Sequence, residues 1–383
     1  MARIELGMDL KSRSSQVVID PLVLADNCLV LGAQGSGKTT LGRVLLEQAQ
    51  ETRIPALFVD TTGDLTSGLM DDAGIPLERG LPDHRPGGAL QLRSVDADIA
   101  AGIFLEPRSG LGEGDSEELL DLSAALLGVL GYRARKRAPE ALLITTIVEQ
   151  RWRAGSGVSL DELIPLVLRP PVERLGAFGL ERVISSDRRE DLAGAIDGLL
   201  RSPSFSDLGE PRPLLLDLLL GDESTPIATV LSFADRSPSI RRFIVATLLA
   251  KLKRQESFPS GGGLKFLLYF DEGADFLPRG ERTLTSAPLL DALLSWSNPD
   301  VGLVLVAESP EDLHEDVEDL CGTWFVGRMP VSRSRRTVVE ALDLVDPPVD
   351  EVALEKDLRI LDAGQFILRT GRLDELQYFE IRP

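Results

Sequence analysis

One stretch of nine residues combines glycines, a lysine and hydroxyl groups at a spacing that can bind phosphate. The run Gly32-Ala33-Gln34-Gly35-Ser36-Gly37-Lys38-Thr39-Thr40 follows apolar NCLVL and precedes LGRVLLEQAQ, which has helical spacing. Glycines let successive backbone N–H groups point at a phosphate, and the following helix adds its N-terminal dipole. The pattern GxxxxGKT between a strand and a helix predicts that Lys38 bridges the β- and γ-phosphates of ATP and that Thr39 ligates Mg²⁺. The predicted nucleotide-binding residues are Gly32, Gly35, Ser36, Gly37, Lys38, Thr39 and Thr40.

A pair of adjacent acids forms the second candidate group. The apolar run Phe266–Phe270 is followed directly by Asp271 and Glu272. Beside a phosphate-binding loop, we predict that Asp271 holds Mg²⁺ through its water shell and that Glu272 polarises the attacking water. The alternative is a strand that ends in a solvated acidic turn. Two adjacent acids favour hydrolysis over phosphoryl transfer to a small metabolite, because the second acid suits the activation of water.

Further acids follow other apolar runs. Asp60 ends one run and Asp64 lies shortly beyond it, so both are expected at the sheet edge that carries ligands in open α/β folds. For Asp60, a role near the metal and a role in a turn are equally compatible with the pattern. Glu308 ends another run, at the strand tip where a sensor of the γ-phosphate is expected. Ser309 is a good helix N-cap after it, and Pro310 a good first helical residue.

These side chains need a scaffold, and short apolar runs rich in Val, Ile, Leu and Phe provide one. Runs without polar alternation are typical of strands buried on both faces, and the helical spacing between several of them indicates βαβ units. The predicted strands are Cys28–Leu31, Ala56–Asp60, Ile227–Phe233, Phe266–Asp271, Gly302–Ala307, Thr323–Gly327 and Gln365–Arg369.

The predicted fold is therefore α/β: a P-loop NTPase with a mainly parallel central sheet flanked by helices. The region 112–210 differs, because its apolar residues have helical spacing and no convincing strand occurs in it. We predict that 1–111 forms the first part of the ATPase core, 112–210 a helical insertion, and 211–383 the second part of the core.

The order of these motifs resembles the HerA/FtsK-type P-loop ATPases, especially the HerA-like branch of DNA translocases and helicases. The matching runs are LGAQGSGKTT, ALFVDTTGDLTSGL, DEGADFLP and DVGLVLVAESPEDLHEDVEDLCGTWFVGRM. The segment TPIATVLSFADRSPSIRRFIVATLLAKL is similar to the strand and helix that precede the acidic pair in that family. The resemblance covers most of 17–383 and is weak in 112–210.

The resemblance implies a P-loop NTPase fold of the RecA/ASCE-like type, and an ATP-hydrolysing motor that forms a hexameric ring and draws double-stranded DNA through its centre. It also implies a partner such as a nuclease in DNA-end processing, or a role in phage defence, and an arginine supplied by the neighbouring subunit. Arg279, Arg282 and Arg328 are the candidates for that arginine, and Lys38, Asp271, Glu272, Glu308 and Arg328 are the expected catalytic residues. The sequence departs from the family in two ways. Glu308 replaces the glutamine of the sensor, and only about 27 residues precede the first core strand, so the N-terminal β-barrel of HerA is expected to be missing.

The charge balance restricts how DNA could bind. The chain has 41 Lys plus Arg against 61 Asp plus Glu, a net charge of −20. Such a charge argues against wrapping DNA around the outer surface, because phosphates repel it. DNA contact would need one of three local basic clusters, and the dipole-complementing role of cations at helix ends is the alternative for each. These are Arg133, Arg135, Lys136 and Arg137; Lys251, Lys253 and Arg254; and Arg333, Arg335 and Arg336.

The remaining features narrow the compartment and the function class. Cys28 and Cys321 are too few for a disulfide framework, and no apolar run suits a signal peptide or a bilayer span, so we expect a cytoplasmic protein without a membrane segment. His84 and His314 lack partners at the spacing of a zinc site or a nucleophilic triad. The competing function is an ATP-dependent switch or assembly factor that does not translocate DNA, which Glu308 and the acidic balance favour.

Overall fold

The computed structural model describes most of the chain. The described residues are 3–65, 82–84, 89–94, 102–106, 113–133, 135–203, 213–222, 224–233, 236–255, 258, 263–295, 301–343, 350–373 and 375–381. They form two compact units, one made of 1–94, 217–234 and 257–383 and the other of 95–216 and 235–256. None of the described helices combines the length and the apolar character needed to cross a bilayer.

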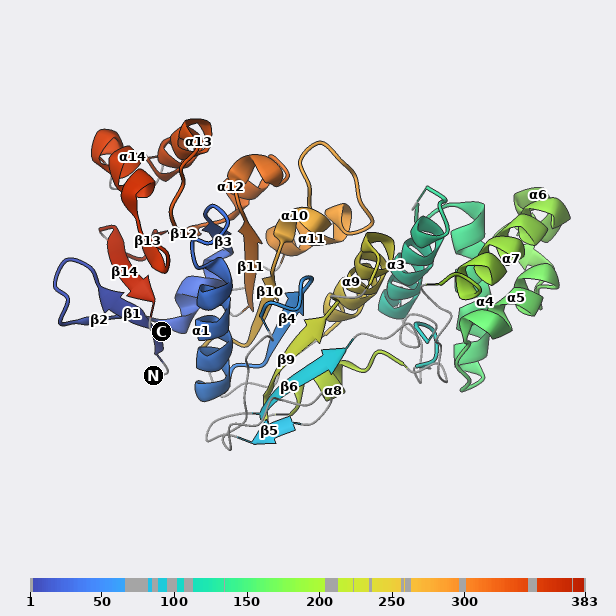
Figure 1. Cartoon of the computed structure of the whole chain (residues 1–383). Helices are drawn as coiled ribbons and strands as arrows, with labels where there is room; N and C mark the ends of the chain where they lie inside the picture. Colours follow the sequence, from blue (N-terminus) through green and yellow to red (C-terminus); the bar gives the residue numbers. More distant parts are fainter. Residues whose placement is uncertain are drawn as a thin grey trace. The chain divides into compact units, whose positions relative to one another are not determined.

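The first unit is built on a twelve-stranded sheet (Figure 1). From one edge to the other its strands are β2 (Gln16–Ile19), β1 (Ile4–Asp9), β14 (Gln377–Ile381), β13 (Gln365–Thr370), β12 (Thr323–Val326), β3 (Cys28–Leu31), β11 (Val301–Ala307), β10 (Phe266–Phe270), β4 (Ala56–Asp60), β9 (Ile227–Ser232), β6 (Ala89–Ser94) and β5 (Pro82–His84). The strands from β12 to β6 pair in parallel, and the outer pairs are antiparallel. The predicted α/β fold with a mainly parallel sheet is confirmed.

Every strand predicted from the sequence is present, with its ends shifted by at most one residue. The strands β3, β4, β10, β11 and β12 are buried along their whole length. Helices cover both faces of such strands, which is why an uninterrupted apolar run identified them.

Helices flank this sheet (Figure 1). They are η1 (Pro21–Asp26), α1 (Lys38–Glu51), α8 (Leu216–Leu220), α10 (Gly273–Phe276), α11 (Ser286–Ser295), η2 (Pro310–Asp312), α12 (Val317–Leu320), α13 (Ser332–Asp343) and α14 (Glu351–Ile360). Leu41, Leu45 and Leu46 of α1 are buried and pack on the sheet in one cluster with Phe58 and Tyr269. This packing holds the first turn of α1 against the carboxyl end of β3.

The two ends of the chain add strands that the sequence analysis did not predict. β1 pairs with β14, with Gly7 opposite Ile381 and Asp9 opposite Phe379. A Cβ atom at Gly7 would lie 2.0 Å from the backbone oxygen of Glu380, so this close pairing requires glycine. The result is that residues from both ends of the chain stand beside the central strands.

The second unit is mainly helical. It contains α3 (Glu113–Val129), α4 (Pro139–Arg153), α5 (Leu160–Leu168), α6 (Leu180–Val183), α7 (Ser186–Leu200) and α9 (Pro238–Leu252). A hairpin of two short strands, β7 (Arg174–Leu175) and β8 (Phe178–Gly179), interrupts the helices, so the expectation that no strand occurs in 112–210 is wrong at this point. The boundaries predicted at 111–112 and 210–211 lie outside the described residues, and α9, which we had assigned to the core, groups with this unit.

Candidate functional site

The glycine-rich loop connects β3 to α1 and is held by a second loop. Gly37 precedes the first residue of α1 with φ of 102°, in the left-handed region that favours glycine. A Cβ atom there would lie 2.8 Å from the backbone nitrogen of Gly364. That nitrogen donates a hydrogen bond of 2.9 Å to the carbonyl oxygen of Ser36. The glycines therefore serve both the curl of the loop and its close contact with the loop before β13.

Lys38 projects into the mouth of this loop. Its Nζ donates to the carbonyl oxygens of Gly32 at 2.7 Å and Ala33 at 3.2 Å. Partial burial lowers the pKa of Lys38, while the carboxylates of Glu308, Glu272 and Asp271 act in the opposite direction. The ammonium group of Lys38 thus lies between the loop and a group of acids, where it can contact the phosphates of a bound nucleotide.

Asp271 lies at the carboxyl end of β10, and its backbone N–H donates to the oxygen of Val59 at 3.0 Å. It is only 4 % exposed. Burial raises the pKa of its carboxyl group to about 7, and the neighbouring Asp60 and Glu272 add to the rise, whereas Lys38 opposes it. Oδ1 of Asp60 accepts from the N–H of Gly63 at 2.8 Å, so this buried acid has a role in the turn after β4.

Glu272 has a strained backbone. Its φ of 57° and ψ of 56° are left-handed, which is uncommon for a residue other than glycine, and such residues cluster at functional sites. A Cβ atom on the next residue, Gly273, would lie 3.1 Å from the oxygen of Val306, so the chain turns tightly against β11. Burial raises the pKa of Glu272, Lys38 lowers it, and Glu308 raises it further.

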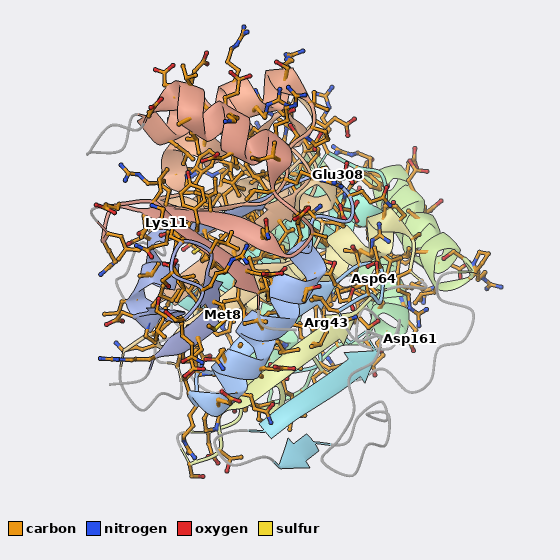
Figure 2. All side chains as sticks on the ribbon, turned by 60° about the vertical axis from the view of Figure 1, so that its left-hand side comes forward. Met8, Lys11, Arg43, Asp64, Asp161 and Glu308 are labelled. Carbon is orange, nitrogen blue, oxygen red and sulfur yellow. The ribbon has the colours of Figure 1, made fainter. Side chains whose placement is uncertain are left out.

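One cavity of about 920 Å³ joins these groups. Its walls are formed by Met8, Gln34, Gly35, Gly37, Lys38, Thr39, Thr40, Thr62, Asp64, Asp271, Glu272, Glu308, Ala363, Gly364, Glu380 and Ile381. Figure 2 shows Met8 and Asp64 on either side of α1, with Glu308 above the helix in that view. The structure therefore brings five of the seven predicted loop residues, the acidic pair and Glu308 into one space.

Two residues of the predicted loop stand behind the cavity wall. Ser36 is fully buried, and its hydroxyl has no hydrogen-bond partner among the described residues. A Cβ atom at Gly32 would lie 2.5 Å from the Oγ of Ser36, so glycine is needed there for packing within the loop.

The Glu308 side chain is exposed, and Ser309 caps η2 by accepting from the N–H of Glu311.

The sequence analysis missed the wall formed by Met8, Ala363, Gly364, Glu380 and Ile381. Met8 belongs to β1 and Glu380 to β14, two short strands with mixed exposure. Gly364, just before the predicted strand 365–369, was the one available signal. On one side of β3 the sheet continues through β12, β13 and β14 to β1, and on its other side lie β11 and then β10. The cavity is lined from both of these sides of the loop.

The three candidate arginines have different surroundings. The carbonyl oxygen of Arg328 accepts from the N–H of Ala33 at 2.9 Å, which places Arg328 beside its own loop, although it does not line the cavity. Arg279 donates to Glu318 at 2.8 Å and to the oxygen of Pro310 at 3.3 Å. Arg282 is exposed and has no ion pair with any described residue.

The site also fits a magnesium ion that arrives with phosphate. Within the described part of the chain, no group of three or more His, Cys, Asp or Glu side chains forms a ready-made metal site. Thr39 and Asp271 nevertheless line the same cavity, and hydroxyl and carboxylate oxygens are ligands that Mg²⁺ prefers. Because Mg²⁺ usually keeps several waters and uses substrate phosphates, two protein oxygens suffice.

Comparison with solved structures identifies the fold. No protein-family model matches the chain, and no curated protein matches it. The structure is similar to VirB4 of Thermoanaerobacter pseudethanolicus, with a TM-score of 0.63 and 13% identity over 99% of this chain and 96% of that one. It is also similar to the unbound bacterial conjugative coupling protein TrwB (TM-score 0.59, 13% identity, 94% and 85% of the two chains) and to TrwB in complex with ADP and Mg²⁺ (0.57, 15%, 94% and 86%). At these identities the comparison shows the fold alone: this chain shares the fold of VirB4 and TrwB.

Proposed function

We propose that this chain is an ATP-hydrolysing motor of the HerA/FtsK type that acts on double-stranded DNA. The observation that carries the proposal is the single cavity in which Lys38 of the glycine-rich loop faces Asp271 and Glu272. A phosphate-binding loop, a buried acid near a metal position and a second acid beside it are the parts that ATP hydrolysis needs. The fold shared with VirB4 and TrwB adds independent support.

Each side chain has a defined task in this proposal. The loop N–H groups and Lys38 hold the phosphates, and Thr39 and Asp271 hold Mg²⁺, which when bound neutralises charge on the phosphate oxygens. Glu272 orients water and accepts its proton, and its raised pKa suits that exchange. With the phosphates on the loop and the acids on the β10 side, the nucleoside extends toward Met8 and Glu380.

Assembly into a ring completes the proposal. Arg279 is held by Glu318 of its own chain, so Arg282 and Arg328 remain as candidates for the arginine that reaches a neighbouring subunit's nucleotide. A homo-oligomeric, hexameric ring gives DNA a central path that is separate from the acidic outer surface. In the cytoplasm the same ring would supply ATP-driven movement of DNA to a DNA-processing partner such as a nuclease.

ATP turnover with and without duplex DNA tests the proposal. We expect a 30-base-pair duplex to stimulate turnover several-fold at low salt and less at high salt. E272Q should lower turnover by at least about 100-fold and still bind ATP, because it removes proton transfer and leaves the loop intact. The matched control is E47Q, the same change at an exposed residue of α1. Equal turnover for E272Q and E47Q would contradict the assigned site.

A second function has one specific observation in its favour. Glu308 adds a negative charge at the strand tip where the resemblance to HerA/FtsK-type ATPases leads us to expect a glutamine, and it lines the same cavity as Lys38. A chain that binds ATP under this repulsion and does not couple it to movement would be an ATP-dependent switch or assembly factor. Turnover that is the same with and without duplex, together with oligomerisation that depends on nucleotide, would establish the switch instead of the motor.

A further inference from the structure

The three basic clusters of the sequence differ in how their cations are used. Lys251 is 2 % exposed, and its Nζ donates to Glu106 at 2.7 Å inside the second unit. Arg335 is 8 % exposed, and its Nη1 donates to the carbonyl oxygens of Met329 at 2.9 Å and Pro330 at 2.6 Å. Two of the clusters therefore commit one of their cations to the protein interior.

The third cluster lies in the connection from α3 to α4 and points outward. Arg133, Arg135 and Arg137 are exposed, and their guanidinium groups form no hydrogen bond or ion pair with any residue that the structure describes. Lys136, between them, is different, since its Nζ pairs with Asp121 at 2.5 Å. The one lysine of the cluster is thus already neutralised, whereas the guanidinium groups of the three arginines remain available to a ligand.

These arginines surround a cavity of about 510 Å³. Arg188 of α7, far away in the sequence, lines the same cavity and is ion-paired with the buried carboxylate of Glu140. Asp191 is the other acid in the wall, so the lining retains a net positive charge. A cationic cavity on a chain with a net charge of −20 is a marked local reversal of sign.

The wall also supplies a neutral donor. Tyr132 lines the cavity, and partial burial together with the charges of Glu140 and Asp191 raises its phenol pKa. Its hydroxyl group therefore keeps its proton at neutral pH and can donate to an anion. The site combines planar guanidinium forks with a hydroxyl donor, which is the set of groups that recognises phosphate oxygens.

We propose that this cavity, formed by Tyr132, Arg133, Arg135, Arg137 and Arg188, binds the phosphodiester backbone of double-stranded DNA. The inference rests on the proposed function and names where on the chain the DNA is held. Duplex DNA fits better than a small anion, because the three free arginines stand exposed around the cavity and can engage several phosphates together. Contacts of this type position DNA and carry no sequence information.

Matched triple variants of the full chain test the site. The first changes Arg133, Arg135 and Arg137 to Gln, and the control changes Arg169, Arg182 and Arg201, three exposed arginines of the same unit outside the cavity, to Gln. We expect the first variant to bind a 30-base-pair duplex at least tenfold more weakly and to flatten the dependence of log K on log salt by roughly two to three. The control, which has the same change in net charge, should bind as the parent does.

The outcomes separate the site from the function. If both triple variants lose affinity equally, only net charge matters and the assigned site is wrong. If the parent hydrolyses ATP and does not bind the duplex, the DNA motor itself is wrong. If the first variant keeps its DNA affinity and loses binding to poly-glutamate, the cavity is a docking site for an acidic protein and the proposal is overturned. A triple Arg→Lys variant that keeps its fold should recover part of the affinity, because it restores charge without the guanidinium fork.

Discussion

Replacing Asp271 with asparagine should make the metal-free chain more stable at alkaline pH. The Asp271 carboxyl group is 4 % exposed, and its pKa in the folded chain is about 7 instead of 3.8. A folded-state pKa above the unfolded one means that the ionised form is disfavoured by folding. The loss in free energy of unfolding that ionisation causes is absent below about pH 4, grows as the pH rises, and is complete above about pH 7.

The size of the effect follows from the two pKa values. At about 1.36 kcal/mol for each pKa unit, ionised Asp271 lowers the free energy of unfolding by roughly 4 kcal/mol at pH 8. At pH 5.5 the group is mostly protonated in the folded chain, and the cost is roughly 2 kcal/mol. D271N removes the titrating group, so its stability relative to the parent should improve by about 2 kcal/mol between pH 5.5 and pH 8.

Urea unfolding at the two pH values, without metal or nucleotide, measures this difference. The control is D64N, which makes the same change at an exposed acid in the same cavity, where the carboxylate keeps its hydration. Mg²⁺ with ADP should stabilise the parent and have much less effect on D271N. If the stability difference between D271N and the parent is the same at pH 5.5 and pH 8, the argument from burial is refuted.

Two further substitutions test the loop and the sensor position. G37A should lower the free energy of unfolding by roughly 1–3 kcal/mol and abolish stabilisation by ADP, because a Cβ atom would strain the backbone and lie 2.8 Å from the nitrogen of Gly364. Thermal melts with and without ADP measure the loss of stability and the loss of ADP binding. G194A in α7 is the control. E308Q should strengthen ATP binding more than ADP binding, since the Glu308 charge faces the cavity end that holds Asp271 and Glu272; equal changes for the two nucleotides would contradict this placement.

The sequence was most informative where one physical rule dominates. Strands such as Cys28–Leu31 and Phe266–Phe270 are buried on both faces, so a short apolar run was enough to predict them and the acids that follow. The glycine-rich loop was equally clear, because phosphate binding demands particular residue types at particular positions. The central strands of the fold could therefore be predicted residue by residue, and so could the loop residues and acids that line the candidate cavity.

The sequence was least informative where tertiary contacts decide. β1 and β14 have mixed exposure and no clean alternation, so their pairing, which brings Met8 and Glu380 to the cavity, left no local signal. The basic cluster at 133–137 was visible, yet nothing in the sequence indicates that Arg188 joins it or that Lys251 and Arg335 turn inward. Such placements depend on contacts between segments distant in the chain, which periodicity cannot report.

The acidic character of the chain reaches into the nucleotide cavity itself. Asp64, Asp271, Glu272, Glu308 and Glu380 line it, and Lys38 is the cation among the described lining residues. A triphosphate without a counterion would meet net repulsion there, so the cavity favours nucleotide that arrives with Mg²⁺. Burial, with repulsion from Asp60 and Glu272 added to it, raises the pKa of Asp271 and destabilises the metal-free chain. Asp271, which weakens the metal-free fold, is thus one of the acids that make nucleotide binding depend on the metal, and this dependence applies to a DNA motor and to a switch alike.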